Sequence, residues 1–181
     1  MEWDDYADGW DDDPMVRDYA LAAFRSLEED AASRGRKVSG LRALDFGCGT
    51  GQLTERLRGE FEAVDAVDSS TAMLQVLAAK AERLGWDNVS VCETVPNLGA
   101  TYDLIVASSV CAFLDDYPAK VAELARSLSP GGMFVQWDWE LDPAATEPFG
   151  LTREEVSTAL ERAGLLEVRV GVAFSVGSEP D

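Results

Sequence analysis

The sequence of 181 residues contains no histidine. This absence excludes Ser-His and Cys-His catalytic pairs and removes the commonest zinc ligand, so we expect no metal site. Basic residues are also scarce: 15 lysines and arginines stand against 34 aspartates and glutamates, a formal charge of −19. So acidic a chain repels a phosphate backbone, and we therefore expect neither nucleic acid nor an anionic membrane as a partner.

Cysteine and long apolar runs are scarce as well. The three cysteines, Cys48, Cys92 and Cys111, are odd in number and form no C-x-x-C motif, so we expect buried thiols in a reducing compartment. No run approaches the roughly 20 apolar residues that span a bilayer. The first residues lack the basic and apolar regions of a signal peptide. These features predict a cytoplasmic protein.

The chain is long enough for one domain, which we expect to span residues 1–181 in three parts. Residues 1–13 form an acidic segment that carries Trp3, Tyr6 and Trp10. This segment is either a solvated, frayed tail or, as its aromatic residues favour, a cover for something apolar. An Asp-Pro pair at positions 13 and 14 predicts a helix over residues 14–32, and the core follows over residues 41–177.

Strand and helix patterns alternate from residue 41 onward. We predict seven strands, at residues 41–46, 61–67, 89–92, 104–108, 133–139, 166–170 and 172–176. We predict four helices between them, at residues 52–58, 70–84, 118–128 and 152–164. This alternation is typical of an α/β fold with a mostly parallel sheet and helices on both faces. Ligands of such folds bind beyond the carboxyl ends of the strands.

A glycine-rich turn follows the first predicted strand, with the sequence Leu-Asp-Phe-Gly-Cys-Gly-Thr-Gly over residues 44–51. Glycines allow a sharp turn and bring backbone close to a ligand. Two features differ from the dinucleotide fingerprint: Asp45 replaces an apolar residue, and the third glycine comes one position early. The turn therefore favours a ligand with a cationic group and no pyrophosphate.

A second acidic position, Asp68, ends the second predicted strand. A carboxylate at this place can accept hydrogen bonds from both hydroxyls of a ribose. Alternatively, Asp68 caps the helix that follows.

Four motifs in this order resemble the class I S-adenosylmethionine-dependent methyltransferases, in particular their small methyltransferase-domain group. They are D-x-G-C-G-T-G from residue 45, D-x-S-x-x-M-L from residue 68, Y-D-L-I-V-A-S-S-V from residue 102 and L-x-P-G-G from residue 128. The resemblance extends over residues 6–170. It implies a Rossmann-like sheet of about seven strands, an additional N-terminal helix, and S-adenosylmethionine as the cofactor, with S-adenosylhomocysteine as its product.

The resemblance also implies which residues contact the cofactor. By this resemblance, Asp45 holds the ammonium group of S-adenosylmethionine and Asp68 holds its ribose, while Tyr6 and Trp10 close over the bound cofactor. The remaining implied contacts are Gly47, Cys48, Gly49 and Ser108 at the methionine part, and Ser69, Met73, Glu93 and Thr94 at the adenine.

The acceptor side is apolar after the fourth predicted strand, because Val-Cys-Ala-Phe over residues 110–113 replaces the histidine-containing stretch of many relatives. Phe113, Trp137 and Trp139 are predicted to form an aromatic wall around the acceptor. Alternatively, alternate residues of the fifth strand pack into the core.

An oxygen acceptor also needs a base, and histidine is absent. The candidates are Asp138, Glu140 and Tyr6, although both acids could equally be solvated loop residues.

The sequence thus predicts a methyltransferase that moves a methyl group to a small-molecule acceptor by in-line displacement. Two alternatives stay open. One is a catalytically weak cofactor-binding scaffold or a subunit that a partner activates. The other is an NAD(P)-dependent oxidoreductase, which would need a dinucleotide fingerprint and a catalytic Tyr-Lys pair or histidine that we cannot place.

Overall fold

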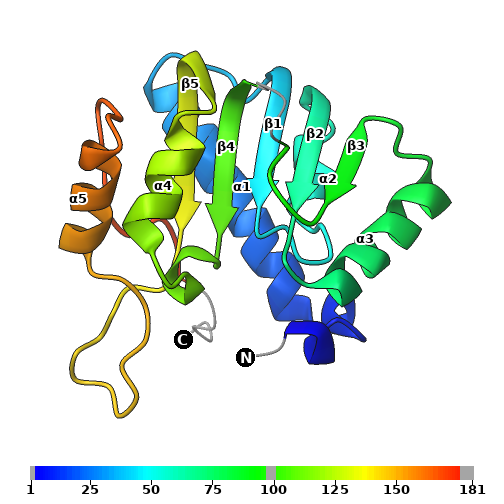
Figure 1. Cartoon of the computed structure of the whole chain (residues 1–181), viewed down its shortest axis with the longest axis horizontal. Helices are drawn as coiled ribbons and strands as arrows, with labels where there is room; N and C mark the ends of the chain where they lie inside the picture. Colours follow the sequence, from blue (N-terminus) through cyan, green and yellow to red (C-terminus); the bar gives the residue numbers. More distant parts are fainter. Residues whose placement is uncertain (1–2, 97–100, 176–181) are drawn as a thin grey trace.

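A parallel sheet of five strands forms the centre of the computed structural model, which describes residues 3–96 and 101–175 (Figure 1). The strands lie in the order β3-β2-β1-β4-β5. Their bounds are Gly40–Phe46 (β1), Phe61–Val67 (β2), Val89–Cys92 (β3), Tyr102–Ser108 (β4) and Leu128–Trp137 (β5). The strand order reverses between β1 and β4, and this reversal opens a crevice at the carboxyl ends of the strands.

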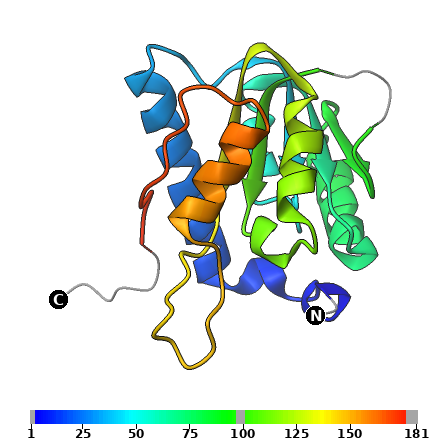
Figure 2. The same cartoon turned by 60° about the vertical axis from the view of Figure 1, so that its left-hand side comes forward.

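Helices cover both faces of the sheet (Figures 1 and 2). Apolar residues of the strands alternate between the faces: Ala43 packs in one cluster with Leu27, and Leu44 in another with Leu124. The first face carries α1 (Pro14–Ser33), α2 (Thr54–Leu57) and α3 (Thr71–Leu84), and the second α4 (Tyr117–Ala125) and α5 (Arg153–Arg162). Three short 3-10 helices complete the fold: η1 (Trp3–Tyr6), η2 (Trp10–Asp12) and η3 (Cys111–Phe113). No helix among the described residues combines the length and the apolar character needed to cross a membrane.

Local capping signals place the helix ends close to the predicted positions. The Asp13 side chain accepts a hydrogen bond from the Met15 backbone at 2.8 Å and so begins α1. Ser70 caps α3, which ends at Gly85 in a left-handed conformation. Thr152 forms the expected capping box at the start of α5.

The prediction of about seven strands was wrong, because the described part of the chain forms five. Residues 166–175 contain no strand, and Val176 and Gly177, like Met1 and Glu2, lie outside the described residues. Glu167 has a left-handed φ of 56°, which interrupts an extended ladder, and the side chain of Leu166 is 88% exposed. Residues Val168 and Val170 instead pack against the cluster beneath α4 and α5.

The bounds of β5 and of the helix before it also differ from the prediction. The helix ends at Ala125, and β5 begins at Leu128 and ends at Trp137. The Ser-Pro-Gly-Gly stretch lies inside the strand, at an irregularity where the register with β4 shifts. Gly131 takes a left-handed φ of 78° there, which permits the irregularity. As a result Asp138 and Trp139 follow the strand instead of belonging to it.

Candidate functional site

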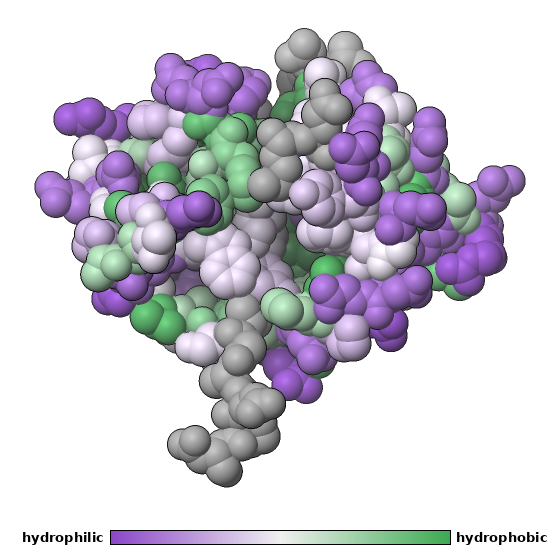
Figure 3. Space-filling view, turned by 90° about the horizontal axis from the view of Figure 1, so that it is seen from below, coloured by the Kyte–Doolittle hydropathy of each residue, from purple (hydrophilic) through white to green (hydrophobic). Residues whose placement is uncertain are grey.

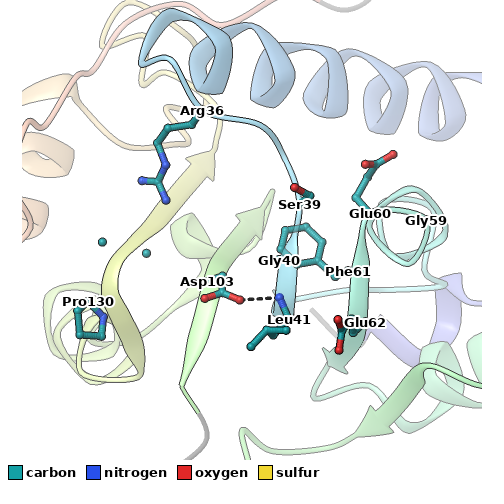
Figure 4. Close-up of a pocket in the computed structure, with 12 residues that line it drawn as sticks. Arg36, Ser39, Gly40, Leu41, Gly59, Glu60, Phe61, Glu62, Asp103 and Pro130 are labelled. Carbon is teal, nitrogen blue, oxygen red and sulfur yellow. Dashed lines mark hydrogen bonds between the residues drawn. The ribbon is translucent and has the colours of Figure 1, made fainter.

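Two hollows of nearly equal volume lie at opposite ends of the strands. The first, of about 750 Å³, opens at their amino ends beside Gly40 and Asp103 (Figure 4). Asp103 accepts hydrogen bonds from the backbone of Leu41 at 2.7 Å and of Arg42 at 3.2 Å. Figure 4 shows the side chains of Arg36 and Glu60 spread around this hollow instead of converging on one point.

The second hollow, a cleft of about 740 Å³, lies at the carboxyl ends of β1, β2 and β4. Figure 3 views the molecule from this end, with strongly hydrophilic residues around the rim and less hydrophilic ones near the middle. Because this is the edge at which the strand order reverses, it is where a fold of this kind binds its ligand.

Asp45, at the end of β1, is 1% exposed and lines the cleft. Its Oδ2 accepts a hydrogen bond from the Thr54 hydroxyl at 2.6 Å. Its Oδ1 is buried and accepts none from any described residue. Burial raises the pKa of Asp45 to about 6, and the nearby charge of Asp68 adds to the shift. Asp45 therefore brings a carboxylate to the wall of the cleft, where it favours a cationic ligand once it is ionised.

The glycine turn brings backbone to the surface of the cleft. Gly47 and Gly49 have left-handed φ values of 76° and 52°. A Cβ at Gly47 would come within 2.5 Å of the Val110 side chain, whereas a Cβ at Gly49 would meet no atom within 4 Å. The space beside Gly49 is therefore open to a ligand, and only glycine leaves it open without strain.

Asp68 connects the glycine turn to the start of α3. Its Oδ2 accepts a hydrogen bond from the Gly49 backbone at 2.8 Å, and its Oδ1 accepts one from the Ser70 backbone at 2.9 Å. The cap of α3 is Ser70, so Asp68 does not fill that alternative role. Each carboxylate oxygen has a second lone pair, so Asp68 retains capacity for further donors.

Residues 3–12, which we call the N-terminal strap, are anchored across the same edge. Asp11 accepts hydrogen bonds from the side chains of Thr50 at 2.5 Å and Gln52 at 2.9 Å, and pairs with Lys80 at 2.6 Å. Burial would raise the pKa of Asp11, but these three groups outweigh it and lower the pKa. At the other end of the strap, Asp4 accepts a hydrogen bond from the Ser70 hydroxyl at 2.5 Å.

The strap also places aromatic residues at the cleft. Trp3 and Trp10 line it, and the Trp3 ring meets that of Phe113 edge-on at 4.9 Å. Tyr6 does not line the cleft: its side chain is 49% exposed and its ring lies 6.1 Å from that of Trp3. For residues 3–12 the structure thus favours a cover over a frayed tail.

The structure brings together all the cofactor residues predicted from the sequence except Tyr6. The residues that line the one cleft are Asp45, Gly47, Cys48, Gly49, Asp68, Ser69, Met73, Glu93, Thr94, Ser108 and Trp10. Cys48 is buried, which raises the pKa of its thiol well above the usual value. No group of three or more acidic or cysteine side chains within residues 3–96 and 101–175 could hold a metal ion.

The predicted acceptor residues separate into two groups. Phe113 and Trp139 line the cleft. Trp137 does not: it is 5% exposed, packs in the core beneath α1, and donates a hydrogen bond from Nε1 to the Ser26 hydroxyl at 3.2 Å. Trp137 therefore follows the alternative in which the fifth strand packs inward.

Among the residues that line the cleft although the sequence did not single them out, Tyr19 and Ser109 bring polar groups beside the aromatic rings. Tyr19 belongs to the apolar stripe of α1, yet its ring reaches the cleft, and burial raises the pKa of its phenol. Ser109, directly after β4, has a left-handed φ of 52°. The position of Ser109 just beyond a strand end is the one signal that could have identified it.

None of the three predicted bases lines the cleft. Asp138 accepts hydrogen bonds from the Ala112 backbone at 3.2 Å and from the Gln136 amide at 3.0 Å, and burial raises its pKa to about 6. Glu140 is exposed and pairs with Arg153 at 2.7 Å, which lowers its pKa. Tyr6 belongs to the outer side of the strap.

A family model described as "Methyltransferase domain" matches residues 44–134, which is half of the chain. The matched segment contains the glycine turn, Asp68, the whole of β2, β3 and β4, and parts of β1 and β5. The chain therefore belongs to the class I family of S-adenosylmethionine-dependent methyltransferases. This membership rules against the alternative of an NAD(P)-dependent oxidoreductase.

Individual relatives agree with the family. A ubiquinone biosynthesis O-methyltransferase of Mesorhizobium japonicum is 33% identical, over 88% of this chain and 72% of its own. A malonyl-[acyl-carrier protein] O-methyltransferase of Serratia marcescens is also 33% identical, over 65% of this chain. The chain spans about half of the length of that protein, 46%, and 41% of a namesake from Hahella chejuensis.

A solved structure of a methyltransferase from Aquifex aeolicus, described as dependent on S-adenosylmethionine, shares the fold. It superposes with a TM-score of 0.67 and 26% identity, over 89% of this chain and 86% of its own.

Proposed function

We propose that this chain is an S-adenosylmethionine-dependent methyltransferase that acts on a small-molecule acceptor. The observation that carries the proposal is Asp45, whose carboxylate lines the cleft beside the glycine turn. A carboxylate calls for a donor, and the ammonium group of S-adenosylmethionine provides a donor with a positive charge. The family membership supports the same conclusion.

Other residues of the cleft fit the remaining parts of this cofactor. Backbone at Gly49 can approach the methionine part closely because no Cβ fills the open space beside it, and the missing Cβ of Gly47 lets the turn pack against Val110. Asp68 has lone pairs available for the ribose hydroxyls. The proposed contacts further include Cys48 and Ser108 at the methionine part, Ser69, Met73, Glu93 and Thr94 at the adenine, and Trp10 as a cover. When bound, the cofactor supplies a methyl group that its sulfonium already activates.

The chain itself contributes alignment and exclusion of water. Phe113 and Trp139 restrict where an acceptor can lie in the cleft, and Trp3 and Trp10 of the strap reduce the access of water. Alignment of two reacting groups can lower a barrier by about 7–11 kcal/mol. Alignment is therefore the main source of rate that we propose for this site.

An oxygen acceptor must also lose a proton. Among the candidate bases, Asp138 suits this role best, because its pKa of about 6 lies near neutral pH. Glu140 suits it less, because Arg153 lowers the pKa of its carboxylate. Asp138 does not line the cleft, so the proton would reach it through a water or through a neighbouring side chain. Tyr19 is such a neighbour, because the charge of Asp138 contributes to the raised pKa of the Tyr19 phenol.

The proposed setting is the cytoplasm, and the proposed partner is a small molecule rather than a nucleic acid. The formal charge of −19 supports this view, because it opposes the approach of a phosphate backbone. The free thiols of Cys48, Cys92 and Cys111 support a reducing compartment.

A binding scaffold without catalysis is the second candidate. One observation favours it: none of the three predicted bases lines the cleft. A scaffold would bind the cofactor but would leave every acceptor unchanged.

Calorimetric titration with S-adenosylhomocysteine tests the proposal first. We expect saturable binding by the wild type, binding at least about tenfold weaker by Asp45→Asn, and no saturable binding of NADH. Methyl transfer from tritium-labelled S-adenosylmethionine to a panel of phenols and amines then separates an enzyme from a scaffold. Failure of the wild type to bind S-adenosylhomocysteine would refute both candidates.

A further inference from the structure

The charge that lines the cleft is almost entirely negative. Its ionisable carboxylate and ammonium residues are Asp13, Asp45, Asp68, Glu93, Glu123 and Lys120. The ammonium group of Lys120 lies 2.6 Å from a carboxylate oxygen of Glu123, so its charge is already balanced. An anionic acceptor would therefore meet repulsion in this cleft, and the described residues that line it offer no free cation to offset that repulsion.

Aromatic rings supply the walls of the same space. Two ring pairs border the cleft: Trp3 with Phe113, with centroids 4.9 Å apart, and Tyr19 with Trp139, 6.1 Å apart. Phe113 also packs on Phe149 at 4.8 Å. The side chains of Phe113 and Trp139 nevertheless remain 37% and 43% exposed, so their faces are available to a flat ligand.

Polar residues line the same cleft beside these rings, namely Ser108, Ser109 and Tyr19. The two serines also lower the pKa of the Tyr19 phenol, against the larger effect of burial. The left-handed backbone of Ser109 costs free energy in a residue with a Cβ, and such strain gathers at functional sites. The Ser109 backbone is fixed by a hydrogen bond of 2.8 Å to the Trp137 carbonyl.

From these three observations we infer that the acceptor end of the cleft selects a flat aromatic molecule without a carboxylate. Its ring lies against Phe113 and Trp139, and its hydroxyl or amine meets the polar residues Ser109 and Tyr19. This inference rests on the proposed function, because it assigns the space beside the cofactor to the acceptor. It names a substrate class that the family membership leaves open.

Three ligands that share one ring test the inference: 4-ethylcatechol is neutral, dopamine is a cation, and 3,4-dihydroxyphenylacetate is an anion. Each is titrated calorimetrically into the protein saturated with S-adenosylhomocysteine. We expect the neutral and cationic ligands to bind at least about tenfold more tightly than the anion. Equal or tighter binding of the anion overturns the inference, and so does the absence of binding by all three.

Two variants separate charge from stacking. Glu123→Gln leaves the charge of Lys120 unbalanced, so the anion should gain about threefold to tenfold in affinity while 4-ethylcatechol should not change. Glu62→Gln removes the same charge at the far hollow and serves as the matched control, without effect on either ligand. Trp139→Ala should weaken all three ligands about fivefold or more.

The outcomes distinguish this inference from the proposed function. If S-adenosylhomocysteine binds and the aromatic ligands do not, only the substrate class falls. If S-adenosylhomocysteine does not bind, the proposed function falls with it. An unchanged affinity of the anion in Glu123→Gln would show that charge in the cleft does not select the acceptor.

Discussion

The two ends of the strands differ in construction far more than in size. Hollows of about 740 and 750 Å³ lie at the carboxyl and amino ends, and each contains a left-handed glycine and an aspartate that accepts backbone hydrogen bonds. Only the carboxyl end adds a buried carboxylate oxygen without a partner, a strap anchored over it and aromatic walls. Volume therefore does not identify the functional end, whereas enclosure by the strap and by the aromatic walls does.

The largest expected difference concerns the two glycines. Gly49 and Gly131 both have left-handed φ, and a Cβ at either would meet no atom within 4 Å. Valine at either position carries similar backbone strain, at least about 1–2 kcal/mol. Gly49→Val also fills the cleft, so calorimetry should show binding of S-adenosylhomocysteine weakened by about 100-fold or more. Gly131→Val should lower thermal stability to a similar extent and leave binding unchanged, and retained binding in Gly49→Val would contradict the assignment of the turn.

The two aspartates form the second pair. Asp68→Ala removes the acceptor for the Gly49 and Ser70 backbone and the proposed contact with the ribose, so the affinity for S-adenosylhomocysteine should fall about tenfold. Asp103→Ala removes the acceptor for the Leu41 and Arg42 backbone at the other end. We expect it to cost about 1–2 kcal/mol of stability without a change in affinity. Circular dichroism should show that both variants fold, and equal affinities in the two would rule out the ribose contact.

Local motifs account for what the sequence predicted well. The glycine turn, Asp68 and the caps at Asp13 and Ser70 depend on residues within a few positions of each other, so their geometry follows from short-range chemistry. For the same reason β2 and β3 match the predicted bounds fully, and β1 and β4 differ from them by at most two residues, whereas β5 begins five residues early.

Contacts between distant segments account for what the sequence did not predict. The ion pair between Asp11 and Lys80 joins the strap to α3. These two residues are far apart in the sequence, so no local pattern of residues predicts their contact. Trp137 was misassigned to the cleft although it shares strand parity with Met133 and Val135, which pack toward the same core beneath α1. Trp139 has the same parity but lies past the end of β5, where the alternation no longer fixes its direction.

The buried carboxylate makes the carboxyl end sensitive to pH. Asp45 has a pKa of about 6 in the folded protein against 3.8 as the ordinary value, so between these values the folded state binds more protons than the unfolded one. Its contribution to stability is therefore present at low pH and is lost as the pH rises from about 4 to about 6. Binding of a cationic group favours the carboxylate, so affinity for S-adenosylhomocysteine should rise about tenfold from pH 5 to pH 7.

Two variants separate the sources of this pH dependence. Asp45→Asn should abolish the dependence of affinity on pH. Asp138, whose pKa burial also raises to about 6, lies outside the cleft, so Asp138→Asn should reduce the slope of stability between pH 4 and pH 6 and leave the slope of affinity intact. A pH-dependent affinity that persists in Asp45→Asn would remove this carboxylate from the cofactor site.

The strap gives the smallest expected effect, because it covers the cleft without forming its floor. Asp11→Asn removes the ion pair with Lys80 and weakens the hydrogen bonds from Thr50 and Gln52. The strap should then be held less firmly over the cleft, which would leave the carboxyl end as open as the hollow at the amino end. We expect the dissociation rate of S-adenosylhomocysteine in stopped-flow tryptophan fluorescence to rise about threefold, with a smaller change in the association rate, because the anchored strap slows escape. Asp12→Asn, a change of the same charge at the next, exposed position, is the control and should alter neither rate. Equal rates in the two variants would mean that the strap lies at the cleft without restricting it, and that the enclosure of the carboxyl end comes from the aromatic walls alone.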